Sequence, residues 1–268
     1  MPEGDSVYRL ARRLDSRMLG GVLARGDLRV AAHATADLSG RRILAHDTHG
    51  KHLLTRFDDG LTLHTHLRMD GSWTVTAPGR SLPRRLLPDV RVLLAVEDGT
   101  TAHGLSLPVV ELLRTRDEHR AVGHLGPDPL REDWDPAEAV RRLGLAPDRP
   151  LAAALLDQRN LAGLGNLWAN ELCFLRGASP WTPVGDVDLV ALVRLGARAL
   201  RHSAHSRDGY QVTTGSRRRG ESHWVAGRAG RPCLRCGTTV RVEAEVPGDP
   251  GRRRTWWCTH CQPGPGPG

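Results

Sequence analysis

The stretch "LLDQRNLAGLGNLWANELCF" (residues 155–174) decides the fold predicted for the second half of this 268-residue chain. Apolar residues at both ends recur at helical spacing, and the central glycines favour tight turns. The pattern therefore predicts a helix, a double turn and a second helix. Asn166 stands where the second helix begins, next to backbone N–H groups that can hold a phosphate, although ordinary helix capping would explain the same residue.

Helical spacing also occurs on either side of this stretch. Three further segments repeat apolar residues every three or four positions: 136–145, 150–158 and 186–203. In the last segment we expect one buried stripe, formed by Leu189, Val190, Val193, Leu195 and Leu200. The proline-rich "LGPDPL" (residues 125–130) precedes all three, so it predicts a boundary before a small helical domain over roughly residues 130–206.

The first part of the chain has a different pattern. A helix is predicted over residues 5–19, where four apolar side chains share one face: Val7, Leu10, Leu14 and Met18. From there to about residue 115, short apolar runs such as "HLLTRF" and "RVLLAV" alternate with turn sequences such as "DDG" and "EDG". We therefore expect one helix followed by an antiparallel β sandwich or barrel.

Four of the five cysteines form two C-x₂-C pairs near the end of the chain: Cys233, Cys236, Cys258 and Cys261. Each pair folds into a tight turn that aims two thiolates at one point, so two pairs complete a tetrahedral zinc site. The alternating "TVRVEAEV", the turn "PGDPG" and the returning "RRRTWW" between the pairs predict a β-hairpin. We predict one structural Zn²⁺ per chain on this hairpin; four unligated thiols are the less favoured alternative.

Basic residues dominate the charge of the chain. The formal net charge of +8 and a pI near 10.2 indicate a polyanionic partner, either nucleic acid or an acidic membrane surface. The turn of the cysteine hairpin is followed by three arginines, Arg252, Arg253 and Arg254. A solvated run of charge is one interpretation of them, and the other is that three cations on a rigid tip bind phosphates. No apolar run approaches the about 20 residues that span a bilayer, and the first residues lack an apolar signal region, so we expect a soluble intracellular protein.

Lys51, in "THGKHLL" (residues 48–54), is the only lysine among the 38 basic residues of the Lys and Arg count. An ammonium group can release and accept a proton near neutral pH more readily than a guanidinium group, which is effectively always protonated. A catalytic or ligand-contacting amine is therefore one interpretation of Lys51, and an ordinary surface lysine on a turn is the other.

Five features together resemble the formamidopyrimidine-DNA glycosylase and endonuclease VIII family, and they occur in that family's order. They are "MPEG" at the start, Lys51 in "HGKHLL", then "HLRMDGSW", the helix–double turn–helix and the cysteine hairpin. The resemblance covers nearly the whole chain and implies an α+β protein. It implies an N-terminal helix plus antiparallel β-sandwich domain over residues 1–124 and a helix-two-turns-helix DNA-binding domain with a basic linker over residues 125–222. A C-terminal β-hairpin zinc finger follows over residues 223–262, and residues 263–268 form a tail of disordered composition.

The resemblance assigns catalysis to the first residues. Pro2 corresponds to the family's nucleophile and Glu3 to its acid–base partner. Removal of Met1 would leave Pro2 as a secondary amine with an ordinary pKa near about 8, able to attack the C1′ carbon of a nucleotide and form an iminium. A helix start also favours proline and glutamate, so helix initiation is the competing explanation. The family often has an acidic residue where this chain has Ser6, and whether Asp5 substitutes for it is open.

The resemblance also implies residues that contact DNA. Lys51 reaches the lesion and its phosphate, and Met69 is a wedge that fills the gap left by a flipped-out base, the alternative being a core methionine. Asn166 and Arg253, with Arg254 as the near alternative, grip phosphates around the flipped nucleotide. The basic segment "RDGYQVTTGSRRRG" (residues 207–220) contributes to lesion recognition or binds backbone.

The implied protein is a bifunctional DNA glycosylase and abasic-site lyase of base excision repair. It would act as a monomer in the bacterial cytoplasm, associated with the nucleoid and not with a membrane, on double-stranded or partly single-stranded DNA. No "DPRRFG"-type loop occurs between residues 90 and 120, and the "MPEG" start and "HLRMDGSW" resemble the endonuclease VIII branch, particularly its actinobacterial forms. That resemblance implies oxidised pyrimidines as the preferred substrates. A lyase acting mainly on abasic sites and a non-catalytic DNA-damage binding protein are the alternatives.

Overall fold

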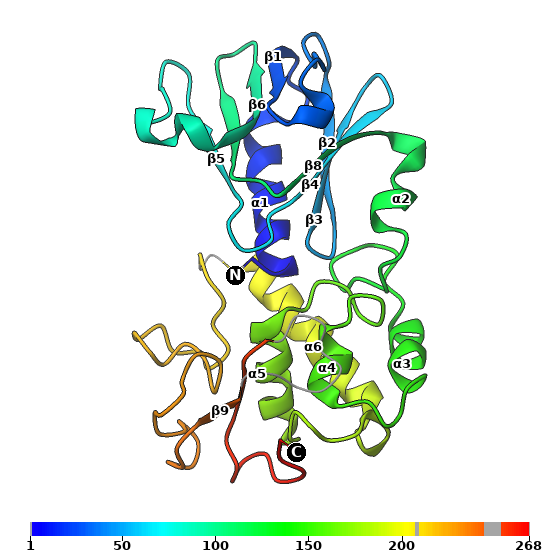
Figure 1. Ribbon diagram of the computed structural model, residues 1–268, viewed down its shortest axis with the longest axis vertical. Coiled ribbons are helices and arrows are strands. Elements are labelled where there is room, and N and C mark those ends of the chain that lie inside the picture. Colours follow the sequence, from blue (N-terminus) through cyan, green and yellow to red (C-terminus); the bar gives the residue numbers. More distant parts are fainter. Residues whose placement is uncertain (1, 207–208, 244–252, 268) are drawn as a thin grey trace. The chain divides into compact units, whose positions relative to one another are not determined.

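The computed structural model describes residues 2–206, 209–243 and 253–267. The chain divides into two compact units, Met1–His124 and Leu125–Gly268, which Figure 1 colours from blue to green and from green to red. No helix in the described ranges is both long and apolar enough to cross a membrane.

The first unit combines helix α1 (Gly4–Met18) with two four-stranded antiparallel sheets (Figure 1). One sheet has the order β1-β6-β7-β5 and the other β2-β3-β4-β8. The strands of the first sheet, in that order, are Leu23–Leu28, Val90–Val96, Thr101–Leu105 and Ser72–Thr76. Those of the second are Ile43–His49, His52–Phe57, Leu61–His66 and Val109–Arg114. Short helices complete the unit: Ala31–His33, Arg84–Asp89, Thr115–Asp117 and α2 (His119–Val122).

One hydrophobic core joins α1 to both sheets. The helix contributes the four residues predicted from their spacing, and all of them are buried: Val7, Leu10, Leu14 and Met18. In β6 every second residue is buried, as expected for a strand with one face on the core. The N-terminal helix and antiparallel β-sandwich predicted from the sequence are therefore confirmed.

The second unit is helical at its start. Its helices are α3 (Pro136–Gly144), α4 (Leu151–Leu156), α5 (Asn166–Arg176), the short Val184–Asp186 and α6 (Leu189–His205). The predicted helix, double turn and helix is α4, residues 157–165 and α5. Gln158 closes the double turn, since its side-chain amide donates to the carbonyls of Leu156 (3.1 Å) and Leu164 (2.7 Å) and its oxygen accepts from the N–H of Gly163 (3.1 Å).

The stripe predicted for α6 is only partly right. Val193 and Leu200 are buried and Leu189 and Leu195 are half-buried, but Val190 is 58% exposed. Val190 lies in the first turn of α6 and lines an open groove of about 1000 Å³ between α3 and α6. Buried Leu192, which the predicted stripe omitted, packs in the helical core instead.

Strands β9 (Arg241–Glu243) and β10 (Thr255–Trp257) pair antiparallel and form the predicted cysteine hairpin. The tip of the hairpin, with Arg252, lies outside the described residues. In the tail, for which the composition predicts disorder, the carbonyl oxygen of Pro265 accepts a hydrogen bond from Ser179 Oγ (2.5 Å). The division of the second unit at residue 222 stays a prediction.

Candidate active site and nucleic-acid interface

Pro2 and Glu3 lie immediately before α1. The helix begins at Gly4, so Pro2 does not occupy its first turn, and the side chain of Glu3 makes no capping hydrogen bond to the helix. Glu3 is nevertheless completely buried. A carboxylate is rarely buried without hydrogen bonds or a counter-charge, and capping of α1 does not explain the burial of this one. The structure therefore weakens the competing explanation for the "PE" pair.

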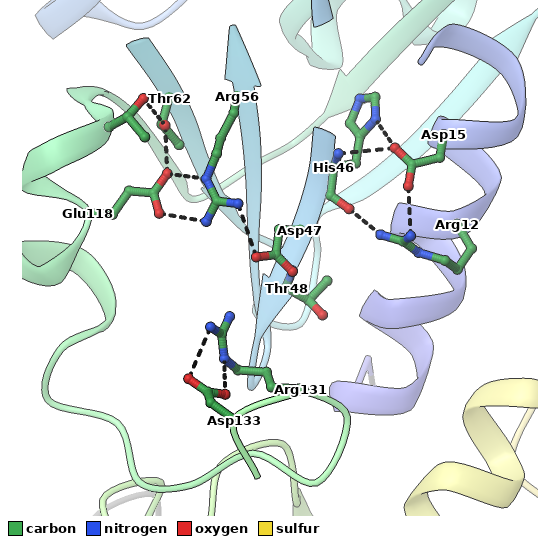
Figure 2. Close-up of polar contacts among 11 residues, drawn as sticks. Arg12, Asp15, His46, Asp47, Thr48, Arg56, Thr62, Glu118, Arg131 and Asp133 are labelled. Carbon is green, nitrogen blue, oxygen red and sulfur yellow. Dashed lines mark hydrogen bonds and ion pairs between the residues drawn. The ribbon is translucent and has the colours of Figure 1, made fainter. Parts of the chain in front are cut away.

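Polar contacts attach α1 to strand β2 (Figure 2). Asp15 Oδ1 accepts hydrogen bonds from the backbone N–H (3.0 Å) and the ring Nδ1 (2.9 Å) of His46. Arg12 pairs with Asp15 (2.9 Å) and donates to the carbonyl oxygen of His46. Although burial raises the pKa of Asp15, the hydrogen bond from His46 and the charge of Arg12 outweigh it and lower that pKa. These bonds fix the helix that follows Pro2 relative to the sheet.

Lys51 lies in the two-residue turn between β2 and β3, where His49 pairs with His52. Gly50 has φ 58°, a left-handed conformation that glycine adopts without a steric penalty and that a tight hairpin turn requires. Lys51 is half-buried at the end of this hairpin. The turn thus presents one amine at the end of a rigid pair of strands.

A second polar network holds the strands that lead to this turn (Figure 2). Arg56 on β3 donates to both carboxylate oxygens of Glu118 (2.7 Å each) and pairs with Asp47 on β2 (3.2 Å). Thr62 on β4 donates to the same carboxylate (2.7 Å). A bidentate guanidinium–carboxylate pair has a defined geometry, so these contacts restrict the relative movement of three neighbouring strands.

Met69 lies at the tip of the connection between β4 and β5 and is 63% exposed, so it does not belong to the core. The connection is tight: Gly71 N–H donates to the carbonyl of Leu67 (2.8 Å), and a Cβ at Gly71 would come within 2.7 Å of that oxygen. Arg68 adopts φ 46°, which is strained for a residue other than glycine. In Figure 1 this connection, the β2–β3 turn and the start of α1 lie at the same end of the first unit.

In the second unit, Asn166 lies beside the arginines of the hairpin. Its side-chain amide donates to the carbonyl oxygen of Arg254 (2.9 Å), and its own backbone begins α5. Asn170, one turn later, accepts from the N–H of Trp256 on β10 (2.7 Å). The helix start and the described base of the hairpin are therefore joined at residues 166 and 254, with Arg253 half-buried and Arg254 exposed.

Glu171 is a site-supporting residue that the sequence analysis missed. It is completely buried on α5, and its carboxylate accepts from the backbone N–H groups of Trp224 (2.8 Å), Val225 (2.9 Å) and Ala226 (2.9 Å). Thr213 Oγ1 donates to it as well. One side chain thus attaches two places to the double-turn helix: Thr213, in the middle of the basic segment, and residues 224–226, beyond its end. A glutamate amid the apolar residues of "NLWANELCF" was the available signal.

The four cysteine sulfurs converge, with all four within 4.8 Å of one another. Cys233 Sγ lies 3.9 Å from Cys261 Sγ, and Cys236 Sγ lies 3.4 Å from Cys258 Sγ. Zn–S bonds of about 2.3 Å in a tetrahedron place sulfurs about 3.8 Å apart, so the donor set fits a metal of that kind. Cys173 is separate: it is buried in the helical core, and burial raises its pKa to about 12.

Asp5 is buried in the first turn of α1 and pairs with Arg9 (3.4 Å). Ser6, the position where the family often has an acid, donates its hydroxyl to Asp5 (3.5 Å). Of the basic linker, residues 207–208 lie outside the described ranges, while Thr214 and Ser216 are joined to Glu221 by hydrogen bonds.

Comparisons with known proteins cover the whole chain. The family model of the formamidopyrimidine-DNA glycosylase N-terminal domain matches residues 1–104, and that of the formamidopyrimidine-DNA glycosylase H2TH domain matches residues 125–199. "Probable endonuclease 8 2" of Streptomyces coelicolor is 52% identical over 100% of this chain and 96% of its own length. "DNA-(apurinic or apyrimidinic site) lyase Nei2" of Mycolicibacterium smegmatis is 42% identical over 98% of this chain and 99% of its own length.

Solved structures agree with these relatives. The MutM (Fpg) protein of Thermus thermophilus superimposes with a TM-score of 0.73 at 29% identity, covering 98% of this chain and all of the other. Lactococcus lactis Fpg in complex with DNA containing an abasic site has a TM-score of 0.75 at 22% identity, which shows the fold. With both domains matched in order and relatives aligned along its full length, the chain belongs to the formamidopyrimidine-DNA glycosylase and endonuclease VIII family.

Proposed function

We propose that this protein is a bifunctional DNA glycosylase and abasic-site lyase of base excision repair, with Pro2 as its nucleophile. The observation that carries the proposal is the completely buried carboxylate of Glu3, next to Pro2 in the chain and not used to cap the helix that follows. A buried acid beside an N-terminal amine suits proton transfer at a sugar carbon.

The chemistry begins with the Pro2 nitrogen, once Met1 is removed. Its lone pair attacks C1′, the bond from C1′ to the damaged base breaks, and the base leaves with a proton. Opening of the C1′–O4′ bond, with proton transfer by Glu3, produces an iminium cation. The iminium makes the C2′–H acidic, so loss of that proton expels the 3′ phosphate, and a second elimination expels the 5′ phosphate. The ammonium of Lys51 contacts the lesion or its phosphate.

The remaining predicted residues would bind DNA. Exposed Met69, on a strained connection, would fill the gap left by the flipped nucleotide and recover part of the few kcal/mol that unstacking costs. Asn166 and the backbone N–H groups at the start of α5, with Arg253 or Arg254, would contact phosphates. Cys233, Cys236, Cys258 and Cys261 would hold a structural zinc ion, which stiffens the hairpin.

Oxidised pyrimidines are the substrates we propose. The connection between β7 and β8 consists of residues 106–108, "SLP", and it carries neither an arginine nor an aromatic side chain. A connection this short would leave more space beside a flipped base than a longer loop with bulky side chains. We propose that the protein acts as a monomer in the bacterial cytoplasm, near the nucleoid.

Borohydride trapping tests the proposal. Tag-free protein, with loss of Met1 verified by mass spectrometry, is incubated with oligonucleotides that contain thymine glycol or an abasic site, and borohydride reduces any iminium to a stable complex. We expect trapping on both oligonucleotides by the wild type and by Lys51→Arg to a lesser extent, and almost none by Pro2→Gly. No complex on either oligonucleotide, with DNA binding intact, would leave a damage-binding protein.

A lyase that acts mainly on abasic sites is the second candidate, because the relative from Mycolicibacterium smegmatis is named for that activity. Trapping confined to the abasic oligonucleotide, with no release of thymine glycol, would favour this function over the first.

A further inference from the structure

Three histidines and a glutamate cross three strands beside the turn that carries Lys51. His52 lies on β3, His64 and His66 on β4, and Glu111 on β8. The register pairs His52 with His66 and His64 with Glu111, so the four side chains share one face of the sheet. The alternate residues of β3 and β4 point to the hydrophobic core.

The hydrogen bonds in this row have a defined direction. His64 Nδ1 lies 2.8 Å from Glu111 Oε2, and His64 Nε2 lies 2.8 Å from His52 Nδ1. An ionised carboxylate only accepts, so His64 carries a proton on Nδ1. A neutral His64 then presents a lone pair at Nε2, and His52 must donate to it from its own Nδ1. With His64 neutral, both rings are in the Nδ1–H form.

His66 extends the row to the connection that carries Met69. Its Nδ1 accepts the backbone N–H of Arg68 (3.0 Å), so a neutral His66 carries its proton on Nε2. The rings of His52 and His66 meet edge to face, with centroids 4.7 Å apart, while the rings of His52 and His64 are nearly parallel (16°), with centroids 5.0 Å apart. The Lys51 turn and the Met69 connection thus share one set of ring contacts.

The environment lowers the pKa of two of these rings, those of His52 and His66. Burial, and after it the neighbouring His66, His64, His124 and His49, lowers the pKa of His52 to about 2. Burial, and after it Lys51, His64 and Arg68, lowers the pKa of His66 to about 4. Burial and the neighbouring rings therefore favour the neutral form of both His52 and His66.

A metal site does not explain the row. In the parts of the chain that the structure describes, the four cysteines are the only group of three or more side chains whose ligand atoms converge as a metal requires. The histidine nitrogens are instead used in hydrogen bonds to one another, to Glu111 and to the backbone.

We propose that Glu111, His64 and His52 are positioning residues that fix the Lys51 turn and, through His66, the Met69 connection. This inference rests on the proposed function, in which Lys51 contacts the lesion site. His52 directly follows Lys51, so two successive directional bonds anchor the residue next to the amine. A displacement of about 1 Å in a reacting group costs about 10²-fold in rate, which is the scale of effect that such anchoring prevents.

Nitrogen-15 NMR of the histidine rings tests the geometry without any assay of activity. At neutral pH we expect His64 and His52 in the Nδ1–H form, which is the minor form of free histidine, and His66 in the Nε2–H form. The substitution Glu111→Ala should remove the preference of His64 for the Nδ1–H form. Nε2–H signals for both His64 and His52 in the wild type would overturn the proposal.

Single-turnover cleavage of an abasic oligonucleotide tests the consequence. We expect Glu111→Ala and His64→Leu to slow cleavage about 10- to 100-fold, with Kd for the same DNA within about threefold. Glu111→Gln, whose amide oxygen can still accept from His64, should stay near the wild-type rate. His103→Asn, at a buried histidine on β7 of the other sheet, is the matched control. Because Glu111 is half-exposed, its variants should remain folded.

The outcomes separate this inference from the proposed function. Wild-type rates in both Glu111→Ala and His64→Leu would refute the positioning role while leaving the function intact. An inactive wild type would refute the function, and the NMR measurement would still decide whether the row of hydrogen bonds exists.

Discussion

Glu171→Leu is the substitution with the most direct structural prediction. Leucine has a similar size and keeps the helix, but it removes the acceptor used by the N–H groups of Trp224, Val225 and Ala226 and by Thr213. Because Val225 and Ala226 are buried, water cannot replace the lost bonds without opening the segment.

The magnitude follows from the number of donors left unpaired. A buried donor without an acceptor costs about 1–3 kcal/mol. Two fully buried N–H groups and the half-buried N–H of Trp224 therefore place the loss at about 3–6 kcal/mol. Detachment of the segment around residues 213–226 exposes the unpaired N–H groups to water and requires less free energy than unfolding of α5, so we expect local opening. Trp224 stacks on Phe174 (5.3 Å) and Val225 packs against Cys233, so the cysteine hairpin should also loosen.

Hydrogen exchange measured by mass spectrometry would locate the change. In Glu171→Leu, peptides that contain residues 222–228 should lose most of their protection, while peptides of the first unit remain unchanged. Glu171→Gln retains one carbonyl oxygen, so the protection of these peptides should lie between that of the wild type and that of Glu171→Leu. Glu221→Gln is the control, since Glu221 lies in the same segment and its carboxylate accepts a hydrogen bond from Ser216 Oγ (3.0 Å). Unchanged protection of residues 224–226 in Glu171→Leu would refute the reasoning.

Two further predictions concern pH and metal. Asp15→Asn should destabilise the first unit by about 1–2 kcal/mol at pH 7. Because the folded pKa of Asp15 lies below 3.8, the difference in unfolding free energy between wild type and variant should shrink as pH falls below 3.8 through the folded pKa. Urea unfolding at a series of pH values measures that difference, and a difference that stays constant with pH would contradict the prediction. Cys258→Ser, or a chelator applied to the wild type, should remove the bound zinc and abolish the protection of β9 and β10 from hydrogen exchange, while the first unit stays folded. Protein purified without zinc whose hairpin is still protected from exchange would contradict the predicted site.

Local sequence patterns were enough to predict the types of element and their order. The spacing of Val7, Leu10, Leu14 and Met18 predicted α1, and the glycines of residues 155–174 predicted the double turn, because helix periodicity and turn chemistry are properties of neighbouring residues. The paired cysteines predicted a converging donor set for the same reason, since each C-x₂-C turn is local. Val190 shows the limit: periodicity places it on the apolar face, but in the folded protein it lines an open groove and is 58% exposed.

The supporting contacts of the candidate site were decided by tertiary structure. Glu171 and Ala226 are 55 positions apart, His64 and Glu111 are 47, and Asn166 and Arg254 are 88. Which strands become neighbours, and in which register, depends on how both sheets bury their apolar faces together, so no short stretch of sequence contains that information. The sequence by itself determined which residues can carry the chemistry. The fold determined which buried partners hold Glu171, His52 and Asn166 in place, because a directional hydrogen bond exists only when packing brings donor and acceptor to the same point.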